Sequence, residues 1–279
     1  MSEFFSRLTV YFSYPFVWYA LIVGVLISLC ASVFGVILVL KRYSFLGDGL
    51  SHVAFGALAV ATVLKLFSET VFVLPVTALC AVLLLKGGKR GKLPGDAAIA
   101  VMSVGALGIG YLILDLGSAS ANVAGDVCSS LFGSFSILTL SASDLWICLI
   151  LSVIVLGLFA LFYRRIFVVT HDEDFARTLG IRTSVYNLFL AIVTAVIIVL
   201  AMNLVGSLLI SALIVFPALS AMRLCRSFRA TILCSAAFGT GGACLGILTS
   251  LIASTPVGPT IVAMELGIFF LANLLGRKA

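Results

Sequence analysis

Charged residues are scarce in this sequence. Asp, Glu, Lys and Arg together make up 10% of its 279 residues, whereas 62% are hydrophobic, and the mean hydropathy is +1.28. In soluble globular domains about a quarter of all residues are charged, so the composition excludes an ordinary water-soluble fold. It predicts an integral membrane protein.

Several motifs of enzyme active sites are also missing. The sequence has no His-Glu-x-x-His pattern for a zinc protease, no Gly-x-Ser-x-Gly pattern for a serine hydrolase and no Gly-x-x-x-x-Gly-Lys-Ser/Thr loop for ATP. The closest glycine-rich stretch, "KGGKRGK" at 86–92, has neither the spacing nor a strand before it. We therefore expect no catalysis by this chain, and any ATP that drives it must be hydrolysed by another subunit.

Metal-type or redox-type cysteine spacing is absent as well, because no Cys-x-x-Cys pair occurs. Most cysteines lie inside apolar runs, so we interpret them as small buried hydrophobic residues. They are Cys30, Cys80, Cys128, Cys148, Cys225, Cys234 and Cys244.

What the sequence does contain is long apolar runs. They are continuous over about 20 residues, which membrane-spanning helices require, whereas barrel strands would alternate polar and apolar residues. We predict an all-α, polytopic transmembrane helical bundle of about eight or nine spans, with residues 1–279 forming a single domain. The candidate spans are 16–40, 49–66, 70–86, 96–115, 143–163, 184–203, 205–222, 230–252 and 257–276.

The connections between these spans follow from length and turn residues. The uncharged stretch 183–222 is too long for one crossing, so we expect a hairpin that turns near Asn203 and Gly206. The segment "STPVGP" at 254–259 predicts the turn of the last hairpin. Segment 117–142 is interpreted as an external loop with a short interfacial or re-entrant helix.

The basic residues predict the orientation. If the spans alternate sides, every Lys and Arg except Arg7 and Lys65 falls on one face, which the positive-inside rule identifies as cytoplasmic. This topology accounts for the net charge of +6. No nucleic-acid partner is expected, because the basic residues lie in short loops and are not interleaved with aromatic residues.

Asp48 and His52 are the most informative polar pair. They are four residues apart at the start of a predicted span, so they share one helix face, and Gly47, Gly49 and Gly56 leave room for neighbouring helices. A carboxylate and an imidazole are common ligands of divalent transition metals, and two ligands bind loosely enough for an ion in transit. The pair is equally compatible with an N-capping acid beside a hydrogen-bonded histidine, and a proton relay is a further alternative.

Glu265 is the other acid deep in a predicted span. It is suited to complete a metal site, to relay a proton or to pair with a neighbouring helix, and nothing in the sequence chooses among these roles.

The segment 171–181, "HDEDFARTLGI", predicts a short amphipathic helix on the cytoplasmic side. Its acids suit a first helical turn, two apolar residues four apart share a face, and the glycine suits the end of a helix. It is either an ordinary surface helix or a docking surface for a cytoplasmic partner. The residues concerned are Asp172, Glu173, Asp174, Phe175, Ala176, Leu179 and Gly180.

Beyond these patterns, the sequence resembles the permeases of zinc-, manganese- and iron-type ABC importers, the ABC-3 type. The resemblance lies in motifs that follow the order and spacing of that family over nearly the whole chain. They are "LKRYSFLGDGLSHVAFGALA" (40–59), "GDAAIAVM" (95–102), "SLFGSFSILTLSASDL" (130–145), "DEDFARTLGI" (172–181), "GSLLISALIVFPALSA" (206–221) and "TPVGPTIV" (255–262).

The resemblance implies a permease subunit in the bacterial plasma (inner) membrane. Such a subunit works with a cytoplasmic ABC ATPase, an extracytoplasmic metal-binding protein and a second permease copy or paralogue. It carries no permanently bound cofactor, and its cargo is zinc, manganese or iron. The resemblance further implies that Asp48 and His52 contact the metal and that 172–180 is the helix that couples to the ATPase.

Two other functions stay open at this point. Ion-coupled secondary transporters also place Asp and His inside membrane helices, and Glu265 would then carry a coupled proton. A membrane enzyme with metal chemistry is disfavoured by the missing motifs.

Overall fold

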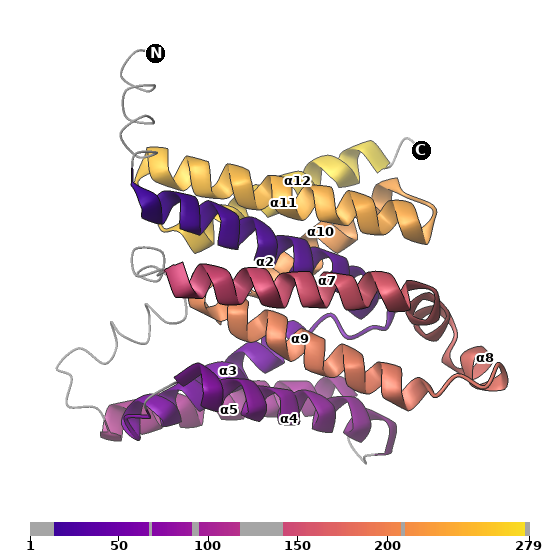
Figure 1. The fold of residues 1–279 in the computed structure, drawn as a ribbon, viewed down its shortest axis with the longest axis horizontal. Helices are drawn as coiled ribbons and strands as arrows, with labels where there is room; N and C mark the ends of the chain where they lie inside the picture. The colour runs from indigo at the N-terminus through magenta and orange to yellow at the C-terminus, as the bar shows by residue number, and fades with distance from the viewer. Residues whose placement is uncertain (1–13, 67–68, 91–94, 118–141, 208–209, 277–279) are drawn as a thin grey trace, which may run out of the picture.

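The computed structural model describes residues 14–66, 69–90, 95–117, 142–207 and 210–276. Within these ranges the chain is helical, and no strand occurs in them (Figure 1). The helices in chain order are α2 (Pro15–Leu40), α3 (Leu46–Val63), α4 (Glu69–Arg90), α5 (Gly95–Gly117), α7 (Ala142–His171), α8 (Glu173–Thr178), α9 (Thr183–Val205), α10 (Ile210–Leu224), α11 (Phe228–Ala253) and α12 (Val257–Gly276). The all-α prediction is confirmed.

The predicted spans correspond to these helices one by one. Seven helices in the described part of the chain are long and apolar enough to cross a membrane, and two shorter apolar helices lie at Glu69–Leu85 and Ile210–Leu224. The hairpin predicted near Asn203 and Gly206 is present, because α9 ends at Val205 and Gly206 follows with a φ of 84°. The predicted loop at 117–142 lies almost wholly outside the described residues.

Helix α2 occupies the centre of the bundle. It packs against α7 and α9 on one side and against α10 and α11 on another, and α12 covers α10 and α11 (Figure 1). Helices α3, α4 and α5 form a second group, which joins the rest mainly through α9. Since α2 and α3 are more buried than α5, α7 or α12, the outer helices present the lipid-facing surface.

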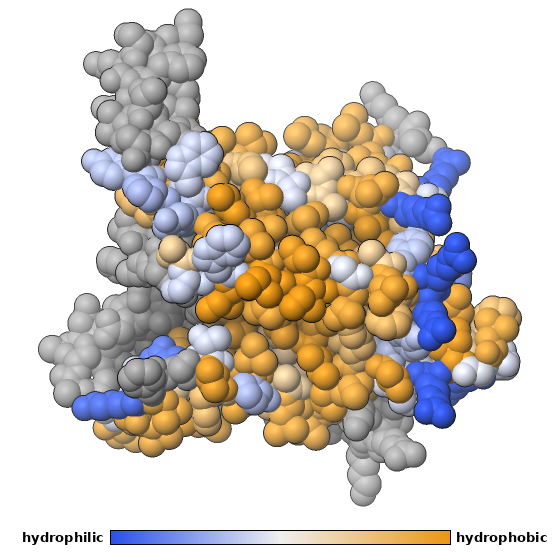
Figure 2. All heavy atoms as spheres, viewed as in Figure 1, coloured by the Kyte–Doolittle hydropathy of each residue, from blue (hydrophilic) through white to orange (hydrophobic). Residues whose placement is uncertain are grey.

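The surface of the bundle shows how it fits a bilayer. A broad apolar band covers the middle of the molecule, and hydrophilic residues concentrate at its ends, most densely at the end from which α8 projects (Figure 2). Lys41 donates a hydrogen bond to Asn187 at this end, and the guanidinium of Arg229 lies 5.7 Å from the ring centroid of Tyr163. These two contacts thus link α2 with α9 and α7 with α11.

Helices α3 and α5 approach each other until their backbones touch. A β-carbon on Gly56 would lie 2.8 Å from the backbone oxygen of Ala106, and one on Gly110 would lie 2.9 Å from the Cα of Gly56. Lipid offers no hydrophobic driving force for helix association, so membrane helices depend on close van der Waals packing. Small residues at the contact allow the two backbones to come this close. The glycines predicted to make room beside α3 therefore do so, and α3 lies inside the bundle.

We expect Gly56→Ala to lower the free energy of unfolding by about 1–3 kcal/mol, because the added carbon meets a backbone atom that cannot rotate away. Unfolding of the purified protein in mixed micelles with increasing sodium dodecyl sulfate measures the effect. Gly105→Ala is the matched control on α5, since its β-carbon meets no described atom within 4 Å. Equal stability of the two variants would show that the α3–α5 contact is not tight.

Candidate metal site

Asp48 and His52 both lie on α3, in its first two turns. The helix begins at Leu46 after the N-cap residue Phe45, and Asp48 is the one acid in its first turn. No side chain caps this N-terminus by a hydrogen bond. Asp48 is therefore not the N-cap residue, but it is an acid in the first turn, where its charge favours the helix N-terminus, and its role as a metal ligand stays a prediction.

His52 is buried and uses one of its two ring nitrogens to contact a neighbouring helix. Its Nδ1 lies 2.6 Å from the Oγ of Ser103 on α5, and the two residues are 7% and 6% exposed. Its Nε2 is buried and has no hydrogen-bond partner among the described residues. The interhelical hydrogen bond considered from the sequence is thus present, and it leaves the second nitrogen unused.

This arrangement is what a metal-binding histidine needs. When Nδ1 carries the proton and donates it to Ser103, the lone pair of Nε2 is free to coordinate an ion, and the ring orientation is fixed. Asp48, one helical turn earlier on the same face, would add an oxygen ligand if an ion bound here. The hydrogen bond and the metal role of His52 are therefore compatible and not alternatives.

Ser103 is the residue that the sequence reasoning missed. It is the one polar side chain in the apolar run 97–110 of α5. A lone hydroxyl in a predicted span is a usable signal, because polar groups inside membrane helices usually contact another helix. The partner helix, however, is not deducible from hydropathy.

Glu265 lies on α12 and is 0% exposed. Both of its carboxylate oxygens lack a hydrogen-bond partner among the described residues, and the side chain occupies the space that a β-carbon of Gly242 on α11 would fill. The described part of the chain holds no group of three or more His, Cys, Asp or Glu suited to a metal. Glu265 is thus not brought into one cluster with Asp48 and His52, and its metal role stays a prediction.

The predicted cytoplasmic helix is present as α8. Asp172 is its N-cap, and its Oδ1 accepts hydrogen bonds from the backbone N–H groups of Asp174 and Phe175 at 3.0 and 2.9 Å. Gly180 follows the helix with a φ of 76°, as its predicted role at the helix end requires. Because the first turn is capped, α8 is a defined helix despite its short length.

Helix α8 and its C-cap residue expose two apolar side chains beside charged ones. Phe175 and Leu179 are 55% and 57% exposed, whereas Ala176 is buried against the bundle. Arg177 forms ion pairs with Glu173 and Asp174 at 3.0 and 3.3 Å. An exposed apolar pair on a helix at the basic end of the molecule is a surface suited to a protein partner.

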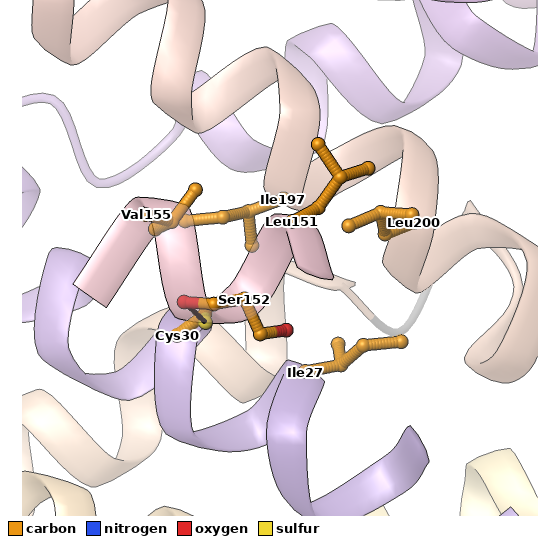
Figure 3. Close-up of a pocket in the computed structure, with 7 residues that line it drawn as sticks. All are labelled: Ile27, Cys30, Leu151, Ser152, Val155, Ile197 and Leu200. Carbon is orange, nitrogen blue, oxygen red and sulfur yellow. Dashed lines mark hydrogen bonds between the residues drawn. The ribbon is translucent and has the colours of Figure 1, made fainter. Parts of the chain in front are cut away.

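A small pocket between α2, α7 and α9 is not a competing ligand site. It is lined mainly by apolar side chains and leaves about 10 Å³, which is roughly the space of one water molecule (Figure 3). Cys30 and Ser152 face it, and the Sγ of Cys30 lies 4.0 Å from the backbone oxygen of Ser152. Cys30 and Cys148 are buried, as expected for hydrophobic cysteines, whereas the other described cysteines are partly exposed.

The fold and the polar pair on α3 define a class, a polytopic membrane protein with ligand-type side chains inside its helical bundle. More specifically, the chain belongs to the ABC 3 transport family, whose model matches residues 13–276. The resemblance to permeases of metal ABC importers is therefore confirmed. The protein is a multi-pass protein of the bacterial plasma membrane.

Relatives of known name agree with this assignment. The chain is 27% identical to the manganese transport system membrane protein MntC of Listeria monocytogenes over 267 residues, which are 95% of this chain and 92% of the relative. It is 26% identical to the manganese import system permease protein ScaB of Streptococcus gordonii, over 95% of this chain and 93% of that one. It is 30% identical to a probable metal transport system membrane protein of Treponema pallidum, over 85% and 86%.

A solved structure supports the fold. PsaBC from Streptococcus pneumoniae in complex with Fab matches with a TM-score of 0.83 and 24% sequence identity, covering 97% of this chain and 94% of the other. The bundle described here is therefore the fold of that protein.

We expect Ser103→Ala to weaken divalent metal binding by about 10- to 100-fold, because loss of a partner that orients a ligating histidine has an effect of this size. Titration of the purified protein with Mn²⁺ or Zn²⁺ measures the affinity. Ser220→Ala is the matched control, since this buried hydroxyl donates to the backbone oxygen of Phe216 within its own helix α10. Unchanged affinity in Ser103→Ala would exclude the orienting role of this hydroxyl.

Proposed function

We propose that this chain is the permease subunit of an ATP-binding cassette importer and moves a divalent transition metal, manganese first, across the plasma membrane. The observation that carries the proposal is the Nε2 of His52, which is buried and has no hydrogen-bond partner in the part of the chain that the structure describes, one turn from Asp48 on α3. Membership in the ABC 3 transport family and the manganese transport relatives support the reaction and the cargo.

The donor set agrees with this cargo without being specific for it. One imidazole nitrogen and one carboxylate oxygen suit manganese, iron and zinc, and affinity alone rises from manganese toward zinc for any such site. The preference for manganese rests on the names of the relatives. A transport assay with each metal would distinguish manganese from zinc and iron as the cargo.

The partners follow from what this chain lacks and what it exposes. It contains no phosphate-binding loop for ATP, so a separate cytoplasmic ATPase subunit supplies hydrolysis. The exposed apolar pair on α8 and its C-cap residue is the contact we assign to that subunit. An extracytoplasmic binding protein delivers the metal, and a second permease copy or a paralogue completes the membrane part. No cofactor stays bound to the chain.

In this mechanism Asp48 and His52 form a transit site. His52 lies about 9 Å along the axis of α3 from Leu46, so the site is inside the bilayer and not at its surface. Access from one side at a time requires two arrangements of the helices around α3, and ATP biases them through its different contacts with the two states. The two ligands hold the ion weakly enough for its release into the cell.

We expect Asp48→Ala and His52→Ala each to reduce metal uptake to the level of cells that lack the protein, because each removes half of the ligand pair. Uptake of radioactive ⁵⁴Mn²⁺ by whole cells is the measurement, and recovery of the complex by affinity purification shows that it still assembles. Asp115→Ala is the matched control, since Asp115 is an exposed acid near the end of α5. Wild-type uptake in both site variants would rule out this pair as the transit site.

The same assay tests the ion-coupled alternative, which family membership disfavours. Uptake that continues without the ATPase subunit and collapses when the proton gradient is dissipated would contradict the ATP-driven function.

The contact assigned to α8 gives a separate expectation. Phe175→Ser combined with Leu179→Ser removes the exposed apolar pair but keeps the Asp172 cap, so α8 folds while the ATPase loses its contact surface. We expect the ATPase to be lost during affinity purification of this double variant. Val185→Ser, an equally exposed apolar position on α9, serves as the control. Full retention of the ATPase by the double variant would contradict the α8 contact.

A further inference from the structure

Asn187 on α9 joins two parts of the chain that are far apart in sequence. Its Oδ1 accepts a hydrogen bond from the Nζ of Lys41 at 2.6 Å, and its Nδ2 donates one to the Oε1 of Glu173 at 3.2 Å. Lys41 is the C-cap of α2, and Glu173 is the first residue of α8. The Asn187 amide therefore links the short helix α8 to the end of the central helix of the bundle.

The α8 side of this link is held firmly. The Oε1 of Glu173 also accepts a hydrogen bond from Arg177 at 3.0 Å, and the Nε of Arg177 donates to Thr183 at 3.2 Å. Thr183 is the first residue of α9. Because α8 is tied to α9 both at Thr183 and at Asn187, a displacement of α8 reaches the Asn187 side chain directly.

The other side of the link leads to the metal site. Only a few residues separate Lys41 from α3, and backbone hydrogen bonds close this loop, with Tyr43 N–H donating to Leu38 and Leu46 N–H donating to Tyr43. Arg42 adopts a φ of 61°, which an L-residue rarely takes, so the loop has a fixed shape. A movement of Lys41 therefore shifts the first turn of α3, which carries Asp48.

The charges at the two ends suit an amide between them. Lys41 is only partly exposed and the side chain of Glu173 is 23% exposed, and each of the two charged groups is hydrogen-bonded to Asn187. An asparagine offers an acceptor to the ammonium and a donor to the carboxylate at the same time. Burial, and after it the charge of Glu173, raises the pKa of Tyr43, which agrees with the carboxylate lying close to the α2–α3 loop.

We propose that Asn187 is a positioning residue that transmits the displacement of α8 to the α2–α3 loop, and so sets the arrangement of Asp48 and His52. The inference rests on the proposed function, since it needs an ATPase that moves α8. The inference adds a specific path, which runs from α8 through Asn187 and Lys41 to the ligand pair on α3. The two hydrogen bonds of the Asn187 side chain are with Lys41 and Glu173, and not with Asp48 or His52.

Two substitutions separate this role from simple stabilisation of the bundle. Asn187→Leu has a similar volume but forms neither hydrogen bond, whereas Asn187→Gln keeps the amide on a side chain one methylene longer. Leu188→Ala, at the next and more exposed position of α9, is the control. The complex with its ATPase and binding protein is reconstituted in liposomes, and ATP hydrolysis is measured without metal and with Mn²⁺.

We expect Asn187→Leu to lower the stimulation of ATP hydrolysis by Mn²⁺ about fivefold or more, as loss of coupling between two sites does. Hydrolysis without metal, recovery of the complex and Mn²⁺ affinity stay near the wild-type values. Asn187→Gln recovers most of the stimulation, and Leu188→Ala retains all of it.

Three results would overturn the proposal. They are full stimulation in Asn187→Leu, equal loss in Asn187→Leu and Asn187→Gln, and failure of the Asn187→Leu complex to assemble, because the last two indicate a structural role. Failure of the proposed function itself is recognised separately, since the wild-type complex would then show no stimulation by any divalent metal.

Discussion

The close approach of α3 and α5 is the constraint on which the candidate site depends. The hydrogen bond between His52 and Ser103 spans only 2.6 Å, and the close approach of the two helices at Gly56 brings these side chains together. The Nε2 of His52 is buried and has no partner in the described part of the chain, and such a nitrogen is costly in a membrane interior unless an ion or another group uses it. The packing of glycines and the chemistry of the imidazole are therefore parts of one arrangement.

Hydropathy and charge predicted most of the fold. Apolar runs bounded by Lys and Arg located the ends of the membrane helices to within five residues, because length and polarity decide whether a segment can cross a bilayer. The exception is α7, which continues to His171, eight residues beyond the predicted end at 163. The capped helix α8 was also recognisable, since Asp172 and Gly180 carry local signals for a helix start and end. Such features depend on residues that are close together in the sequence, so the sequence alone is enough to predict them.

The contacts between helices were not predictable in the same way. His52 and Ser103 are 51 positions apart, and Lys41 and Asn187 are 146 positions apart. Which helices become neighbours depends on the packing of the whole bundle, and hydropathy does not distinguish buried from outer helices here, because the buried α2 and the outer α7 are about equally apolar. Glu265 illustrates the limit, because its acid was visible in the sequence but its place against Gly242 was not.

The packing of Glu265 against Gly242 limits the order in which substitutions at these two positions can be accepted during evolution. Positions 242 and 265 share one volume, with the glycine supplying the space and the glutamate filling it. A larger residue is accepted at 242 only after the side chain at 265 has become shorter, whereas the reverse order passes through an overpacked intermediate. The two positions are thus expected to covary among descendants of this chain, and steric exclusion determines which of them changes first.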